Sequence, residues 1–102
     1  MKKILFSDAF FSKDRKHRYA LWRVWNNNLP KVLFIGLNPS TADEVKDDPT
    51  IRRCINYAKD WGYGGYIMGN IFAYRSTDPK NLKLTNNPIG IDNNSWLKKL
   101  HS

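Results

Sequence analysis

A short apolar run that ends in a polar turn is the feature that most constrains the fold of this chain. Residues 32–35, Val-Leu-Phe-Ile, are rich in β-branched and aromatic side chains, which predicts a strand covered on both faces. Gly36 stops the run, and Asn38, Pro39 and Ser40 follow it. Open α/β folds bind ligands beyond the carboxyl ends of their strands. We therefore take Gly36, Asn38, Pro39 and Ser40 as the candidate binding site.

The residues after this turn predict a helix and a second strand. Asp48 is a favoured N-cap residue, and Pro49 suits the first position of a helix. Apolar residues recur at helical spacing as far as Trp61, and Gly62 is placed to end the helix. Residues 66–75 form a second, mostly apolar run. Strand, helix and strand in this order predict a βαβ unit with parallel strands and a right-handed crossover.

The two strands of a βαβ unit end at the same edge of the sheet. Asn38 and Asn70 are therefore expected to face a common cleft, and Phe72 is a further candidate contact. An amide near the end of an apolar strand needs hydrogen-bond partners. A structural hydrogen bond to a neighbouring loop and a bound ligand explain Asn70 equally well.

The amino-terminal segment predicts two further strands. Residues 2–7 read as a short strand, and residues 8–16 as a charged connection. Residues 17–25 are rich in aromatic and β-branched side chains, which favours a strand over a helix. Because residues 26–30 have the composition of a turn, this strand and the one at 32–35 are predicted to pair as an antiparallel hairpin.

The carboxyl-terminal segment predicts two short helical pieces. Asp78 and Pro79 repeat the capping pattern and should begin a helical turn that ends at Leu82 or Leu84. Residues 92–100 predict a last helix that buries Trp96, Leu97 and Leu100. The whole is a single α/β domain over residues 1–102, in two or three layers, with a βαβ unit and an N-terminal antiparallel hairpin.

The charge of the chain is strongly positive and unevenly placed. There are 17 Lys and Arg against 9 Asp and Glu, for a net charge of +8, yet four of the nine acids lie within residues 43–48. A basic surface favours a polyanionic partner such as nucleic acid or a nucleotide, although a solvated face explains the same charges. The candidate nucleic-acid contacts are Arg15, Arg18, Arg52, Arg53 and Arg75.

The scarcity of cysteine and histidine excludes several classes of site. Cys54 is the one cysteine, which rules out an internal disulfide, an iron–sulfur cluster and a cysteine-rich zinc site; it is predicted to be apolar filler. No Walker loop or dinucleotide fingerprint is present, so no cofactor is expected. Residues 43–48 suit magnesium, but loop solvation and capping by Asp48 explain them more simply. No signal peptide or membrane span is evident, and a cytoplasmic protein without membrane contact is expected.

Five short motifs stand in order between Arg18 and Ala73, and the resemblance that they carry extends to about Asn94. They are Arg18-Tyr19-x-Leu21-x-Arg23-x-Trp25, Ile35-Gly36-Leu37-Asn38-Pro39-Ser40-Thr41-Ala42-Asp43, Asp48-Pro49-Thr50-Ile51-Arg52-Arg53-Cys54, Trp61-Gly62-Tyr63-Gly64-Gly65 and Asn70-Ile71-Phe72-Ala73. Together they resemble an uncharacterised bacterial and phage family, domain of unknown function 1643. That family carries no assigned reaction.

The turn after the central strand also resembles a motif of known chemistry. Residues 36–40 are similar to the Gly-x-Asn-Pro-Gly motif of mismatch-specific uracil and thymine DNA glycosylases. The resemblance implies a uracil-DNA-glycosylase-like core in which Asn38 orients the hydrolytic water. Asn70-Ile71-Phe72 is similar in placement to the strand asparagine of related glycosylases, which implies that Asn70 hydrogen-bonds a flipped base. Asp43 is then a candidate general base.

The sequence departs from the glycosylases in two places. Ser40 replaces the last glycine of the motif, and the His-Pro-Ser-type loop near the carboxyl end is absent. We therefore expect an incomplete sheet. The chain is then a truncated form, a natural short form that has kept a binding surface and lost its chemistry, or a protein that completes its fold as a homodimer. Two functions stay open: a DNA-glycosylase-like hydrolase that recognises a nucleobase or nucleic acid, and a non-catalytic phage or bacterial accessory protein that binds DNA or a protein partner.

Overall fold

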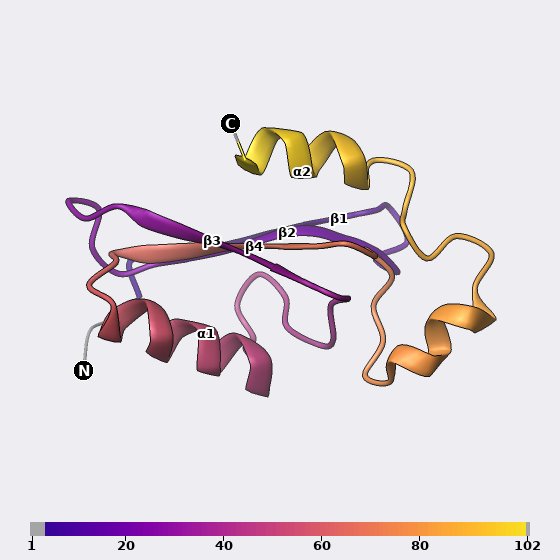
Figure 1. The fold of residues 1–102 in the computed structure, drawn as a ribbon, viewed down its shortest axis with the longest axis horizontal. Coiled ribbons are helices and arrows are strands. Elements are labelled where there is room, and N and C mark those ends of the chain that lie inside the picture. Colours follow the sequence, from indigo (N-terminus) through magenta and orange to yellow (C-terminus); the bar gives the residue numbers. More distant parts are fainter. Residues whose placement is uncertain (1–3, 102) are drawn as a thin grey trace.

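A four-stranded mixed sheet lies between two helices in the computed structural model, which describes residues 4–101 (Figure 1). Helix α1 covers one face of the sheet and α2 the other, so the α/β fold has three layers. The elements are β1 (Phe6–Phe11), β2 (Arg18–Val24), β3 (Lys31–Gly36), α1 (Pro49–Asp60), β4 (Gly65–Asn70), the 3-10 helix η1 (Pro79–Leu84) and α2 (Asn93–His101).

The strand order is β1-β2-β4-β3. Strands β3 and β4 are parallel, as the βαβ pattern predicts, and β2 is antiparallel to both of its neighbours, β1 and β4. The predicted pairing of residues 17–25 with residues 32–35 is therefore wrong. The N-terminal antiparallel hairpin exists, but β1 and β2 form it.

The turn between β2 and β3 explains why these two strands are not neighbours. The backbone N–H groups of Trp25 and Asn26 both donate to the carbonyl of Gly64, at 2.9 Å each. The Gly64 N–H in turn donates to the carbonyl of Pro30 at 2.8 Å. Both ends of the turn thus hold the backbone that leads into β4, which enters the sheet between β2 and β3.

The first strand lies later in the chain than the sequence predicts. It runs over Phe6–Phe11 instead of residues 2–7, of which residues 2 and 3 lie outside the described part of the chain. Asp8, which the sequence analysis assigns to a charged connection, lies within the edge strand β1. Its carboxylate accepts a hydrogen bond from the Ala9 N–H at 2.8 Å. Charged side chains are tolerated on edge strands because one side of such a strand faces water.

Helix α1 begins and ends as its capping residues predict. The carboxylate of Asp48 accepts from the Ile51 N–H at 2.9 Å, and Gly62 adopts a φ of 85° just after the helix. The helix buries Ile51, Ile55 and Ala58 against the sheet. Trp61 differs from the prediction: it is 58% exposed, because the helix has ended and its ring stacks on Tyr57 outside the core.

Cysteine 54 faces the same side of α1 as the buried residues. It is half-buried and packs against the hydrophobic core, as apolar filler should. Burial raises the pKa of its thiol above the ordinary value, which disfavours the reactive thiolate.

The two carboxyl-terminal elements also form where the sequence predicts them. Asp78 accepts from the Lys80 N–H at the start of η1. In α2, Trp96 stacks on Phe10 of β1, with ring centroids 4.9 Å apart. Trp96, Leu97 and Leu100 are half-buried instead of fully buried. No helix within residues 4–101 is long and apolar enough to span a membrane.

Candidate functional site

The segments that follow β3 and β4 continue side by side beyond the ends of the two strands, as the βαβ pattern predicts. Three backbone N–H groups of the second segment donate to carbonyl groups of the first: Ile71 to Gly36 (2.9 Å), Phe72 to Leu37 (2.9 Å) and Ser76 to Pro39 (2.8 Å). The polar turn therefore lies against residues 71–76. The sequence places these two segments correctly at one edge of the sheet.

The side chain of Asn38 ties the two segments together. Its Nδ2 donates to the carbonyl of Ser76 at 3.0 Å and to that of Pro39 at 3.2 Å. These bonds fix the amide and leave Oδ1 of Asn38 as an acceptor that neither bond uses. Asn38 also lines a small, partly open cavity of about 30 Å³, whose other polar lining residues are Arg18, Ser40, Asp48 and Thr50. This cavity has room for about one water molecule.

Asn70 lies opposite Gly36 on the neighbouring strand and does not line this cavity. The two residues face each other in the parallel ladder, and a Cβ on Gly36 would lie 2.9 Å from Asn70 Nδ2. Asn70 is 1% exposed, and its Oδ1 accepts a long, weak hydrogen bond from Arg18 Nη2 at 3.5 Å. The expected common cleft is therefore replaced by close packing, which a glycine at position 36 permits.

Arg18 is buried, which corrects its assignment to the basic surface. It is 2% exposed, and its Nη1 donates to the carbonyl of Ala42 at 3.1 Å. Within residues 4–101, Arg18 Nε has no hydrogen-bond partner and the guanidinium makes no ion pair. Burial lowers the pKa of Arg18 to about 10, while the nearby charge of Asp48 acts in the opposite direction. Ala42, where the chain begins to fold over β2, and Asn70 of β4 both contact this side chain.

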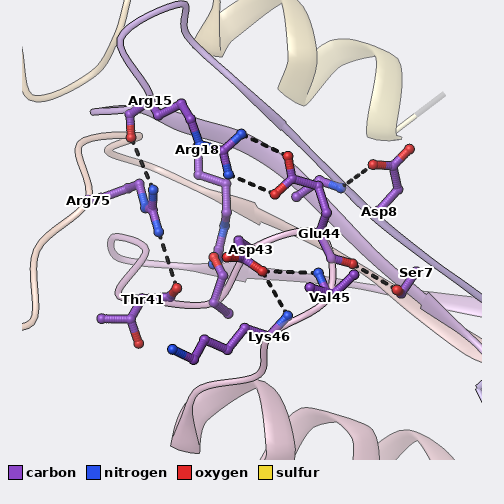
Figure 2. Close-up of polar contacts among 12 residues, drawn as sticks. Ser7, Asp8, Arg15, Arg18, Thr41, Asp43, Glu44, Val45, Lys46 and Arg75 are labelled. Carbon is purple, nitrogen blue, oxygen red and sulfur yellow. Dashed lines mark hydrogen bonds and ion pairs between the residues drawn. The ribbon is translucent and has the colours of Figure 1, made fainter.

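The acidic loop 43–48 is organised by its own hydrogen bonds and by arginines. Asp43 Oδ1 accepts from the N–H groups of Lys46 (2.7 Å) and Val45 (3.0 Å), which hold the pKa of Asp43 below its ordinary value. A carboxylate stabilised in this way is a weaker base. Glu44 pairs with Arg15 through two hydrogen bonds of 2.7 and 2.8 Å (Figure 2). The described residues include no cluster of three or more potential metal ligands.

The Arg15–Glu44 pair is expected to depend on pH through the ionisation of Glu44. Hydrogen bonds from Arg15 lower the pKa of Glu44 to about 2, against an ordinary 4.5. The stabilising pair is therefore fully present above pH 4.5 and is lost as the pH falls towards 2. Glu44 is the only glutamate in the sequence, so a carbon-13 NMR titration of its carboxyl group is unambiguous. We expect a midpoint of about 2 in the wild type and a return towards 4.5 in Arg15→Ala; a wild-type midpoint near 4.5 would contradict the pairing.

Arg75 holds the walls of an open groove beside the turn. Its Nε donates to the carbonyl of Ser40 (3.3 Å), its Nη1 to that of Arg15 (3.2 Å) and its Nη2 to that of Thr41 (3.1 Å); the last two bonds are drawn in Figure 2. The guanidinium groups of Arg75 and Arg15 also lie over the ring of Phe11, at 4.7 and 3.9 Å from its centroid. Burial and the charge of Arg15 hold the pKa of Arg75 below its ordinary value.

We call this feature the basic groove. Its volume is about 360 Å³, and it is lined by Arg15, Lys16, Ser40, Thr41, Tyr74, Arg75, Ser76 and Thr77. A guanidinium carries five N–H groups. Arg75 uses three of its N–H groups in the bonds to the groove walls, and Arg15 uses two of its N–H groups in the bonds to Glu44. Both arginines therefore keep N–H donors for a ligand.

The groove gathers some of the predicted contacts and not others. Arg15, Arg75 and Ser40 line it, whereas Arg52 and Arg53 are exposed on α1 and do not. Phe72 is half-buried and contributes its backbone to the ladder. The sequence analysis missed the hydroxyl groups of Thr41, Ser76 and Thr77 and the ring of Tyr74. The one signal for them is their position next to Ser40 and Arg75 in the chain.

Comparison with known proteins identifies a family and no activity. No curated protein and no solved structure matches the chain. The resemblance to uracil-DNA glycosylases thus stays a prediction. A family match covers residues 18–102, from the first residue of β2 onward, so that Arg15 and Lys16 of the basic groove precede it. The chain belongs to the family described as "Protein of unknown function (DUF1643)".

Proposed function

We propose that this chain binds nucleic acid or a nucleotide through the basic groove. The observation that supports the proposal is the concentration of cations and hydroxyl groups at the edge of the sheet where β3 and β4 end. Arginine and lysine side chains, with hydroxyl groups, are the usual protein ligands of phosphate oxygens. The groove is open, as contact with a polymer requires. With this role we propose a cytoplasmic location.

The electrostatics of the chain favour the same partner. The net charge of +8 attracts polyanions, and the basic groove adds donors at a defined place. Glu44 reduces the local charge, but it also holds the guanidinium of Arg15 by two hydrogen bonds. A guanidinium held in one orientation loses less conformational entropy when it binds phosphate.

Charge reversal at Lys16 tests this proposal. Lys16 is exposed and lines the groove, so Lys16→Glu should weaken binding of a fluorescent 20-nucleotide DNA about 10-fold in low salt, measured by anisotropy. The matched control is Lys31→Glu, which makes the same charge change at the amino end of β3. Equal affinities of the two variants would contradict the assignment of the groove.

Hydrolysis of an N-glycosidic bond is a second candidate function. Asn38 supports it, because its amide is fixed by two carbonyl groups and lines a cavity with room for about one water molecule. In this proposal Asn38 Oδ1 orients the water, Asp43 is the candidate base, and Gly36, Pro39 and Ser40 shape the turn. The near-complete burial of Asn70 gives no support to its contact with a base.

The two candidate functions separate in one assay. Single- and double-stranded DNAs that carry uracil or thymine mismatches would be scored for binding and for abasic sites in parallel. Abasic sites that disappear in Asn38→Ala, in a variant whose thermal unfolding shows that it is folded, support the hydrolase. Binding without abasic sites supports an accessory protein that binds DNA without turnover.

We also propose that β3 pairs with a second copy of this chain. The other edge strand, β1, carries Asp8 and a register irregularity at Phe10/Phe11, and both features disfavour edge-to-edge pairing. Strand β3 has its one charge, Lys31, at its first residue. Two antiparallel copies related by a two-fold axis would therefore keep these lysines at opposite ends of the seam.

Light scattering after gel filtration tests the dimer. Ile35 of β3 is 52% exposed, so Ile35→Lys should convert a wild-type dimer into a monomer. Phe6→Lys is the control, since Phe6 is 51% exposed on the other edge strand. A monomeric wild type at high concentration would contradict this proposal.

A further inference from the structure

A second hollow of about 370 Å³ lies beside the basic groove. Tyr74, Arg75, Ser76 and Thr77 line both. The second hollow adds Asn81 and Leu84, which belong to η1. The two hollows therefore adjoin along residues 74–77, and we call them together the trough; Arg15 and Lys16 line one hollow and Leu84 the other.

Tyr74 is the aromatic residue that lines the trough. Its ring meets that of His17 edge-on, with centroids 5.6 Å apart and an angle of 68° between the ring planes. The backbone N–H of Tyr74 donates to the carbonyl of Pro88, and His17 Nε2 lies 2.6 Å from the carbonyl of Asn87, so both residues of the ring pair are tied to the segment 87–88. A half-buried ring held in this way is a rigid surface on which a planar group can stack.

Two side chains of η1, one polar and one apolar, line the second hollow of the trough. Asn81 Nδ2 donates to the hydroxyl of Ser76 at 3.0 Å, which orients the amide and leaves Oδ1 as an acceptor. Leu84 is 82% exposed. An aromatic ring, an apolar side chain and an oriented amide are the groups that contact a planar heterocycle with polar edges, such as a nucleobase.

We infer that the trough binds single-stranded nucleic acid, with phosphates at Arg15, Lys16 and Arg75 and a base stacked on Tyr74. This inference rests on the proposed function and adds the class of ligand to it. In a duplex each base is stacked between its neighbours, so a single aromatic surface serves only an unpaired base. Sequence-tolerant proteins that bind single strands combine a basic groove with aromatic rings in the same way.

The experiment compares four ligands that separate bases from phosphates. They are a labelled 20-nucleotide single strand, its duplex, an abasic strand of the same length and thymidine monophosphate. The wild type should bind the single strand about 10-fold more tightly than the abasic strand, from stacking of one base. Tyr74→Ala should lose this preference yet bind the abasic strand as before, whereas Tyr74→Phe should keep it. Tyr57→Ala, which removes an exposed ring of α1, is the matched control and should also keep it.

Each other outcome has a distinct meaning. Equal wild-type affinity for the single strand and the abasic strand, or a preference for the duplex, overturns the stacking of a base while the proposed function stands. If thymidine monophosphate competes as well as the single strand, the inference that the ligand is a polymer is overturned. Failure to bind any of the four ligands overturns the proposed function itself. These comparisons use the wild type, so they hold even if Tyr74→Ala does not fold.

Discussion

Replacement of Arg23 with alanine is expected to lower the free energy of unfolding by about 3–5 kcal/mol. Arg23 is 1% exposed, although its place in a basic segment suggests a surface residue. Its guanidinium bonds Asp47 Oδ1 at 2.9 Å and the carbonyl groups of Asp43 and Lys46 at 2.7 and 3.1 Å. One side chain therefore holds the acidic loop to β2. A domain of this size has a total stability of about 5–15 kcal/mol, so the loss is a large fraction of it.

Chemical denaturation of three variants tests this role. Arg23→Lys keeps the charge but lacks the planar fork, and should fall between the wild type and Arg23→Ala. Arg52→Ala is the control, because Arg52 is exposed on α1 and should change the stability by less than about 0.5 kcal/mol. A cost for Arg23→Ala no larger than that of Arg52→Ala would show that the loop is held by other contacts.

Gly64→Ala is expected to cost about 3 kcal/mol or more, because its new methyl group has no space. The methyl carbon would overlap the backbone carbonyl oxygen of Asn26 and lie 2.8 Å from Leu29 Cβ. Gly64 bonds both ends of the turn between β2 and β3, so neither side can move without a loss of these hydrogen bonds.

Gly62→Ala is the matched control in the same loop. Gly62 has a φ of 85°, and no atom lies within 4 Å of a Cβ placed on it. Backbone strain alone should cost about 1 kcal/mol. Urea denaturation of both variants gives the comparison, and a larger loss for Gly62→Ala would contradict the packing described for Gly64.

Local signals explain most of the fold that the sequence predicts. Asp48 with Pro49 and Asp78 with Pro79 mark the starts of α1 and η1, because capping depends on residues close in the chain. The neighbours of β2 could not be predicted in this way. They are set by the contacts of Gly64 with the turn, which join residues about forty positions apart.

In the candidate site, too, the contacts that depend on tertiary structure could not be predicted from the sequence. The turn at Asn38 and the segment after Asn70 were expected to meet, since parallel strands fix where they end. The burial of Arg18 and Arg23 was not predicted, because it depends on how loop 43–48 folds over β2. A basic residue on a strand has the same appearance in the sequence whether it faces water or a loop carbonyl. The position of Tyr74 in the trough likewise follows from tertiary structure.

The dependence of DNA binding on salt tests the central claim most directly. Single strands lose affinity with a slope of about −0.7 per phosphate contact in a plot of log K against log salt concentration. With Arg15, Lys16 and Arg75 in contact, the wild type should give a slope of about −2, and Lys16→Glu a smaller one. An affinity that does not change with salt, or a slope that Lys31→Glu alters and Lys16→Glu does not, would contradict binding of nucleic acid in the basic groove.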